Sequence, residues 1–301
     1  MRMKPRFGRQ CGITGSLSLT NTGMSQGFFP FSKLPTELAL PILAYASGLS
    51  QGTYRSLLLT NKAIHELTCI EMLPLVAVVL TTVRQMTSFK LYLRRPNIIP
   101  HIHSLWAIAP GSESFYHATT LCTNIIRKCT AVRSLACQET VLHAALTPNH
   151  THCVDLTLIG CRQDWRQNLP KFFDQIQHLH LIDSNRDWLP RFKNLTRLTI
   201  ALASDKEILS RESCQDLVKS PKLLQVVITT RRHGKEYEAL SEAAQAIDDR
   251  FGVMHLRRRW KEVDIWRQGL RDPDRFWDQA KEEKYLPPPP RVVKERIFRT
   301  S

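Results

Sequence analysis

The 301-residue sequence predicts an α/β protein made of three consecutive parts. Near the N-terminus, apolar residues recur at helical spacing. In the middle, a short apolar frame typical of a buried strand recurs six times. After Thr230, charged and apolar residues alternate in the manner of surface helices. We therefore expect a small helical unit first, then strands joined by returns, then a charged helical extension.

The helical unit is expected to begin at Phe31, after a leader at residues 1–29 that we predict to be disordered. Pro41 falls inside the first helical pattern, where it removes one backbone hydrogen bond and can kink the helix. Asn61 is a suitable N-cap for a third helix. The expected helices cover about 34–46, 52–59, 61–67 and 80–93.

Six copies of an L-x-x-L-x-L frame organise the middle of the chain. Each copy is typical of a short strand whose alternate side chains enter a core. The central positions are 105, 135, 156, 179, 198 and 226, at intervals of 30, 21, 23, 19 and 28 residues. Most of these intervals lie in or near the range of leucine-rich repeats, so we predict an irregular solenoid of that kind over residues 73–230. An ordinary α/β domain with buried strands is the alternative.

The positions that flank the second apolar residue of each frame should face away from this core. In solenoids that face is commonly the concave binding surface. Trp106, His180 and Arg197 are the first candidates for contact with a substrate, because exposed aromatic residues and arginines are typical anchors. The predicted substrate face consists of Trp106, Asp155, Thr157, His178, His180, Arg197 and Thr199.

The sequence holds little that indicates catalysis. It has no Walker loop, dinucleotide fingerprint, G-x-S-x-G or HExxH motif, and its paired histidines do not match a zinc module. The eight cysteines form no C-x-x-C pair, which indicates free thiols in a reducing compartment, the cytoplasm or nucleus. We predict no enzyme, cofactor or metal.

The net charge of +15 is spread along the chain rather than concentrated in one stripe, which argues against nucleic acid as a partner. No apolar run approaches the ~20 residues needed to span a membrane, and no membrane partner is expected. The acid-free stretch over residues 1–36 leaves mitochondrial import as an alternative.

The C-terminal part, residues 231–301, is predicted to be a charged helical extension. Trp260, Val263, Trp266 and Leu270 share one helical face there and should pack in a core. The run from Pro287 to Pro290 is expected to form a stiff tail.

The segment Leu34-Pro-Thr-Glu-Leu38, with the later Leu57-Leu-Leu59 and Asn61-Lys62, resembles the F-box, so residues 30–72 are assigned to an F-box-like unit. The whole chain resembles fungal F-box proteins with degenerate leucine-rich repeats. This resemblance implies docking to a Skp-family adaptor, and through it to a cullin, in an SCF ubiquitin ligase that receives a protein substrate. The candidate adaptor-binding residues are Leu34, Pro35, Glu37, Leu38, Ile42 and Leu58.

The sequence departs from the F-box pattern at two places. Pro41 interrupts the first helix, and Ala63-Ile-His65 stands where the family has an aromatic residue. The alternative function is therefore a leucine-rich-repeat scaffold for protein–protein interaction that does not engage a ligase.

Overall fold

The computed structural model divides the chain into two compact units, residues 1–39 and 40–301, which are described separately. The predicted leader, Phe31 and the proline run at 287–290 lie outside the described residues. The structure describes residues 34–108, 115–160, 170–182, 189, 192–202, 222–231, 234–256, 261–272, 274 and 276–278.

Three short helices come first: α1 (Thr36–Leu49), α2 (Gln51–Leu58) and α3 (Lys62–Cys69). The Asn61 side chain accepts a hydrogen bond from the backbone N–H of Ile64 at 2.9 Å, which confirms the predicted N-cap. Helix α1 continues through Pro41 to Leu49, so this proline does not end it.

The described residues form one eight-stranded sheet in which every neighbouring pair is parallel and the strands follow the order of the sequence. The strands are β1 (Ala77–Leu80), β2 (Ser104–Ala107), β3 (Ser134–Gln138), β4 (Asp155–Ile159), β5 (His178–Ile182), β6 (Arg197–Ala201), β7 (Gln225–Thr230) and β8 (Phe251–His255). Strands β2 to β7 are the six predicted frames, which confirms the α/β class and these strands. Strands β1 and β8 were not predicted.

The register aligns the frames with one another. Leu105 pairs with Leu135, and the same row continues through the central apolar residue of each later frame to Val226. Each residue in this row is almost completely buried. Because side chains alternate along a strand, the neighbouring positions form a second set of rows on the opposite face.

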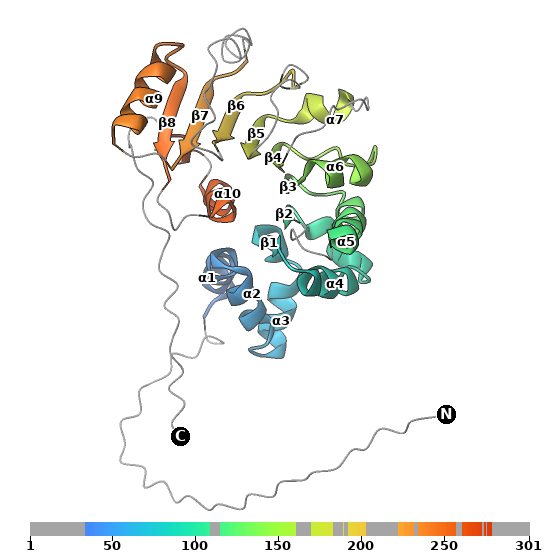
Figure 1. Ribbon diagram of the computed structural model, residues 1–301. Coiled ribbons are helices and arrows are strands. Elements are labelled where there is room, and N and C mark those ends of the chain that lie inside the picture. Colours follow the sequence, from blue (N-terminus) through green and yellow to red (C-terminus); the bar gives the residue numbers. More distant parts are fainter. Residues whose placement is uncertain are drawn as a thin grey trace, which may run out of the picture. The chain divides into compact units, whose positions relative to one another are not determined.

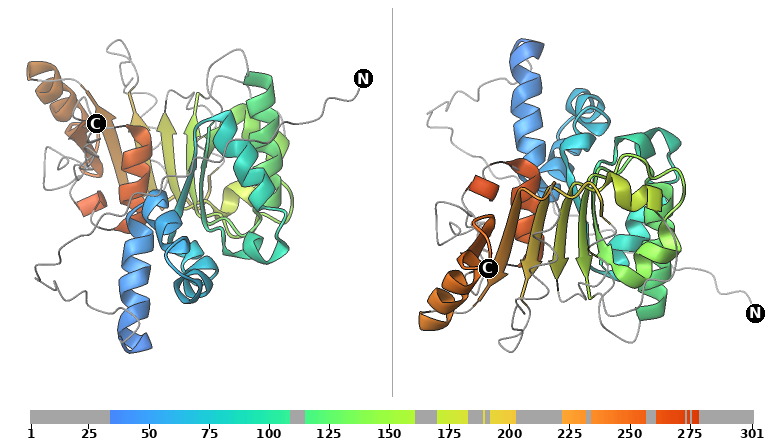
Figure 2. Two further views of the ribbon diagram at one scale, coloured as in Figure 1. Left: turned by 90° about the horizontal axis from the view of Figure 1, so that it is seen from below. Right: turned by 90° about the horizontal axis from the view of Figure 1, so that it is seen from above.

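The helices that connect successive strands cover one face of this curved sheet, which we call the outer face (Figure 1). Helix α10 lies against the opposite face, which we call the inner face, as the views in Figures 1 and 2 agree. The outer helices are α4 (Val83–Tyr92), α5 (Phe115–Lys128), α6 (Glu139–Ala145), α7 (Pro170–Gln175) and α9 (Lys235–Gln245). Two 3-10 turns, η2 (Leu73–Leu75) and η3 (Pro96–His101), precede β1 and β2. The inner helix α10 comprises residues Glu262–Arg271.

The outer core is apolar. Ile125 and Ile126 of α5 and Leu142 of α6 are fully buried, as are the aligned leucines of the strands. Helix α4 begins with a capping box between Thr82 and Gln85, two residues after β1 ends. The sequence prediction of a helix over 80–93 was therefore correct except for its first turn.

Candidate docking surface and inner face of the sheet

Helix α1 exposes apolar side chains along one side within residues 40–301. Ile42 is 48% exposed and Tyr45 is 75% exposed, and Leu49 is exposed as well. Their spacing of three and four residues places them on one helical face. Leu43 and Ser47, in contrast, are buried. Contiguous apolar side chains that remain in water typically mark a protein–protein contact site.

Within residues 34–39, the predicted adaptor-binding residues Pro35, Glu37 and Leu38 are exposed, and Leu34 is partly exposed. The remaining candidate, Leu58 at the end of α2, is half-buried. These side chains are accessible in the way a docking role requires.

Two side-chain hydrogen bonds connect α2 to α3. The Tyr54 hydroxyl donates to the backbone carbonyl of Cys69 at 3.0 Å, and His65 Nδ1 contacts the carbonyl oxygen of Leu58 at 2.8 Å. His65 belongs to the Ala63-Ile-His65 stretch at the start of α3. Its ring therefore joins the two helices through a polar contact.

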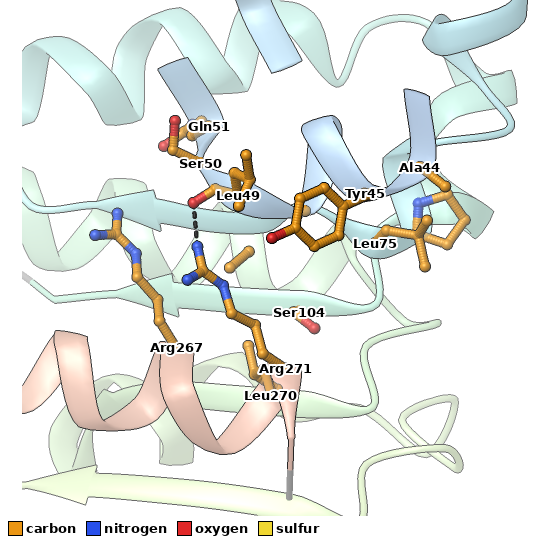
Figure 3. Close-up of a pocket in the computed structure, with 13 residues that line it drawn as sticks. Ala44, Tyr45, Leu49, Ser50, Gln51, Leu75, Ser104, Arg267, Leu270 and Arg271 are labelled. Atoms are coloured by element: carbon orange, nitrogen blue, oxygen red, sulfur yellow. Dashed lines mark hydrogen bonds between the residues drawn. The ribbon is translucent and has the colours of Figure 1, made fainter. Parts of the chain in front are cut away.

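An open pocket of about 450 Å³ lies beside the exposed face of α1, between the end of that helix, η2 and the last turns of α10 (Figure 3). Tyr45, Leu49, Leu75 and Leu270 are among the large side chains that line it. Arg267 and Arg271 supply two guanidinium groups, and Arg271 donates to the backbone carbonyl of Leu49. Burial lowers the pKa of Arg267 from its ordinary value. Chemically, this pocket suits an apolar side chain that lies next to a carboxylate.

The predicted substrate face is the inner face of the sheet, and α10 covers much of it. The expectation that Trp106 is exposed is wrong, because its side chain is 4% exposed and its ring centre lies 5.5 Å from that of Trp266 on α10. Thr157 and Thr199 are also buried. Strand alternation identified the correct side of the sheet, but an element from the C-terminal part shields it.

Three polar members of the predicted face, Asp155, His178 and Arg197, have partners. His178 Nδ1 lies 2.5 Å from Asp155 Oδ1 on the adjacent strand. Arg197 donates from Nη2 to Asp274 Oδ1 at 3.1 Å, and its guanidinium lies 5.6 Å from the ring centre of Trp277. Asp155, His178 and Arg197 are each partly exposed, at the edge of the area that α10 covers.

His180 is the predicted surface residue whose environment differs most from expectation. Its Nε2 lies 3.8 Å from Glu262 Oε2 of α10, which is too long for a hydrogen bond. Neither atom has a hydrogen-bond partner among the described residues. Burial lowers the pKa of His180 to about 4 and raises the pKa of Glu262, while the nearby Arg231 acts in the opposite direction on Glu262.

The sequence interpretation missed that the C-terminal part contributes to this face. The signal was present in the predicted apolar stripe of Val263, Trp266 and Leu270, which does pack in a core as expected. Trp266 also donates from Nε1 to Ser134 Oγ at 3.0 Å. Trp260 of the same stripe lies outside the described residues.

The described residues contain no cluster of three or more His, Cys, Asp or Glu side chains placed to hold a metal ion. His150, one of the paired histidines, contacts the carbonyl oxygen of Ile126 through Nε2 at 2.9 Å, so it has a structural role. Burial raises the pKa of Cys122 and Cys129 to about 12. These two thiols therefore stay protonated at neutral pH and are poor nucleophiles.

In the part of the chain that the structure describes, no helix has both the length and the apolar character to cross a membrane. A scan against models of protein families found no match, and neither did a search of curated proteins or a search of solved structures.

Proposed function

We propose that the chain is a substrate receptor that docks through α1 to α3 onto a Skp-family adaptor of an SCF ubiquitin ligase. In this role it acts without catalytic residues, because holding a substrate near a ubiquitin-loaded enzyme raises the effective concentration of acceptor lysines. The repeat-like sheet would present the substrate, and the adaptor would connect the chain to a cullin.

The exposed apolar face of α1 is the observation that carries this proposal. Ile42, Tyr45 and Leu49 are held in water by a helix whose opposite side is buried. Burying a fully exposed side chain of this size contributes about 1.5–3 kcal/mol, so these three partly to largely exposed side chains can drive a specific association. They follow directly after the Leu-Pro-Thr-Glu-Leu motif that resembles the F-box.

The two departures from the F-box pattern are compatible with docking. Helix α1 passes through Pro41, so the stripe stays on a continuous helix. The contact between His65 and the carbonyl of Leu58 gives α3 an alternative attachment to α2. Both features support a three-helix unit that keeps its arrangement without the usual aromatic residue.

Co-purification with a Skp-family adaptor tests the proposal. Ile42→Asp places a charge in the centre of the apolar face and should reduce adaptor recovery by roughly ten-fold or more, because a charge in a buried apolar contact is costly. Leu91→Asp is the matched control, since Leu91 on α4 is 51% exposed, close to the value for Ile42. Full adaptor recovery with a folded Ile42→Asp protein would contradict the docking assignment.

The alternative is a scaffold that binds other proteins but no adaptor. His65, in place of an aromatic residue, favours it, because a polar tie between α2 and α3 offers less apolar contact area than an aromatic ring. The same pull-down separates the two functions. Co-purifying proteins without any adaptor would support the scaffold.

A further inference from the structure

Helix α10 differs from the outer helices in its place along the chain. Helices α4 to α9 each lie between two strands of the sheet, so none of them can leave without disturbing strand pairing. Helix α10 follows β8, and no described strand follows α10. It can therefore leave the inner face while every described strand pair stays intact (Figure 1).

The contacts of α10 resemble those of a peptide bound in a groove. Trp266 is the central anchor: its ring packs against Trp106 and its Nε1 donates to Ser134 Oγ at 3.0 Å. Ile265 packs beside it with Val227 and Met254 of the last two strands. A buried aromatic residue with one hydrogen bond is a typical hot spot of a protein interface.

The segment that follows α10 continues this attachment. The Gln225 side chain of β7 donates from Nε2 to the backbone carbonyl of Trp277 at 2.8 Å, and Arg197 pairs with Asp274. Asp274 of the covering segment thus meets a basic side chain at the edge of the sheet. The inner face therefore suits a helical segment with buried aromatic residues and an acidic residue that can reach Arg197.

The fit of α10 on this face is incomplete. A cavity of about 200 Å³ remains between the inner face and α10, and it is lined by His178, His180 and Gly269 among others. The unsatisfied atoms of His180 and Glu262 oppose docking, since buried polar atoms without partners are costly. A ten-residue helix is also shorter than the ~12–15 residues that isolated helices need for stability in water, so α10 should lose its helical order when it leaves.

We propose that the inner face of the sheet is a groove for an amphipathic helix, that α10 occupies it as a tethered ligand, and that a helix of another protein with aromatic and acidic residues can replace it. The proposal rests on the proposed function only in assigning that helix to the substrate of the ligase. The substrate helix and α10 would then compete for contacts with Trp106, Ser134 and Arg197.

Two substitutions in α10 shift this competition in opposite directions. Trp266→Ala removes the anchor and should free the groove. Gly269→Ala should hold α10 in place, because a Cβ atom at Gly269 meets nothing within 4 Å and alanine favours the helical state. Both variants leave the residues of the sheet unchanged.

The test adds a fluorescent synthetic peptide of residues 261–278 to the full-length chain and measures binding by anisotropy. The peptide should bind the Trp266→Ala protein roughly ten-fold or more tightly than wild type, because the tethered competitor is weakened. The Gly269→Ala protein should bind it about two- to five-fold more weakly than wild type. A peptide that itself carries Trp266→Ala is the control and should bind none of the three proteins detectably.

Equal peptide affinity for all three proteins, or undiminished binding of the control peptide, would overturn the proposal. If Trp266→Ala prevents folding, as judged by loss of the thermal transition, the comparison of wild type with Gly269→Ala decides the question. Adaptor recovery is measured separately on wild type and Ile42→Asp, because Arg271 of α10 donates to Leu49 and the α10 variants can alter the docking face. A failed peptide ranking with the adaptor bound to wild type refutes this inference alone. The expected ranking with no adaptor bound to wild type refutes the proposed function alone.

Discussion

The two faces of the sheet are covered in different ways. On the outer face, helices between consecutive strands pack on rows of mainly apolar side chains, with Glu139, His150 and His255 among the few buried polar ones. On the inner face, one helix and a short following segment cover a surface that includes Ser134, Thr157, Thr199 and Gln225. Topology makes the first layer part of the fold, whereas in our proposal the second layer can detach without breaking a described strand pair.

The largest effect is expected from a cavity in the outer core. Leu156→Ala removes a side chain that is 1% exposed in the middle of the sheet, and it should lower the free energy of unfolding by about 2–5 kcal/mol. Urea unfolding followed by circular dichroism measures this loss. Leu91→Ala, at an exposed position on α4, is the control and should change stability by less than about 0.5 kcal/mol. A loss for Leu156→Ala that is no larger than that of the control would contradict the assignment of the outer layer to the permanent core.

The stability of the folded protein should depend on pH through His180 of the inner face. The unfolded chain binds a proton at this histidine near pH 6.5, but the folded protein does so only near pH 4, so stability falls as the pH drops through this window. Between pH 6.5 and 5 the loss is about 2 kcal/mol. Glu262 has a raised pKa and acts in the opposite direction, because its cost is present at neutral pH and is relieved by protonation.

Urea unfolding at pH 7 and pH 5 measures this effect in wild type and in His180→Gln. The variant should lose the part of the pH dependence that His180 causes and so be less destabilised by acid than wild type. Identical pH dependence in the two proteins would show that His180 is not held neutral by burial. Leu156→Ala, in contrast, should keep the pH dependence of wild type.

The strands of this fold could be predicted from the sequence, but the layer over their inner face could not. The L-x-x-L-x-L frames identified β2 to β7 because a row of alternating apolar residues is a local pattern. Strand β1 was missed because it lies in the short continuous apolar run at residues 75–80, which fits a helix or a strand equally. Strand β8 was missed because Phe251-Gly-Val-Met-His255 is short and lies between charged segments.

The candidate site could be predicted only in part, again because the sequence patterns are local. Alternation placed Trp106 and His180 on the correct face, but alternation cannot reveal what covers a face. The contact of Trp266 with Ser134 joins residues that are 132 positions apart in the sequence, and no local pattern encodes such a pairing. Of the exposed stripe on α1, only Ile42 was predicted as a docking residue; Tyr45 and Leu49 were missed, and Leu49 lies beyond the predicted end of the helix.

The smallest effect is expected at the margin of the inner layer. Asp274→Asn removes the ion pair with Arg197, but the Asp274 side chain is 79% exposed, so solvent screens the interaction. The change should lower stability by less than about 1 kcal/mol and should become smaller at high salt. Thermal unfolding at low and high salt checks this. A larger or salt-independent loss would indicate that this segment belongs to the permanent core.

Hydrogen–deuterium exchange on the full chain at neutral pH tests the difference between the two layers most directly. Local opening of an attached element exposes its amides without global unfolding, whereas amides of the central strands exchange only when the fold itself opens. We predict that the amides of α10 exchange roughly 100-fold faster than those of β3 to β6, including the amides of Ile265 and Trp266, whose side chains are buried. Equal protection of α10 and these strands would contradict a removable inner layer.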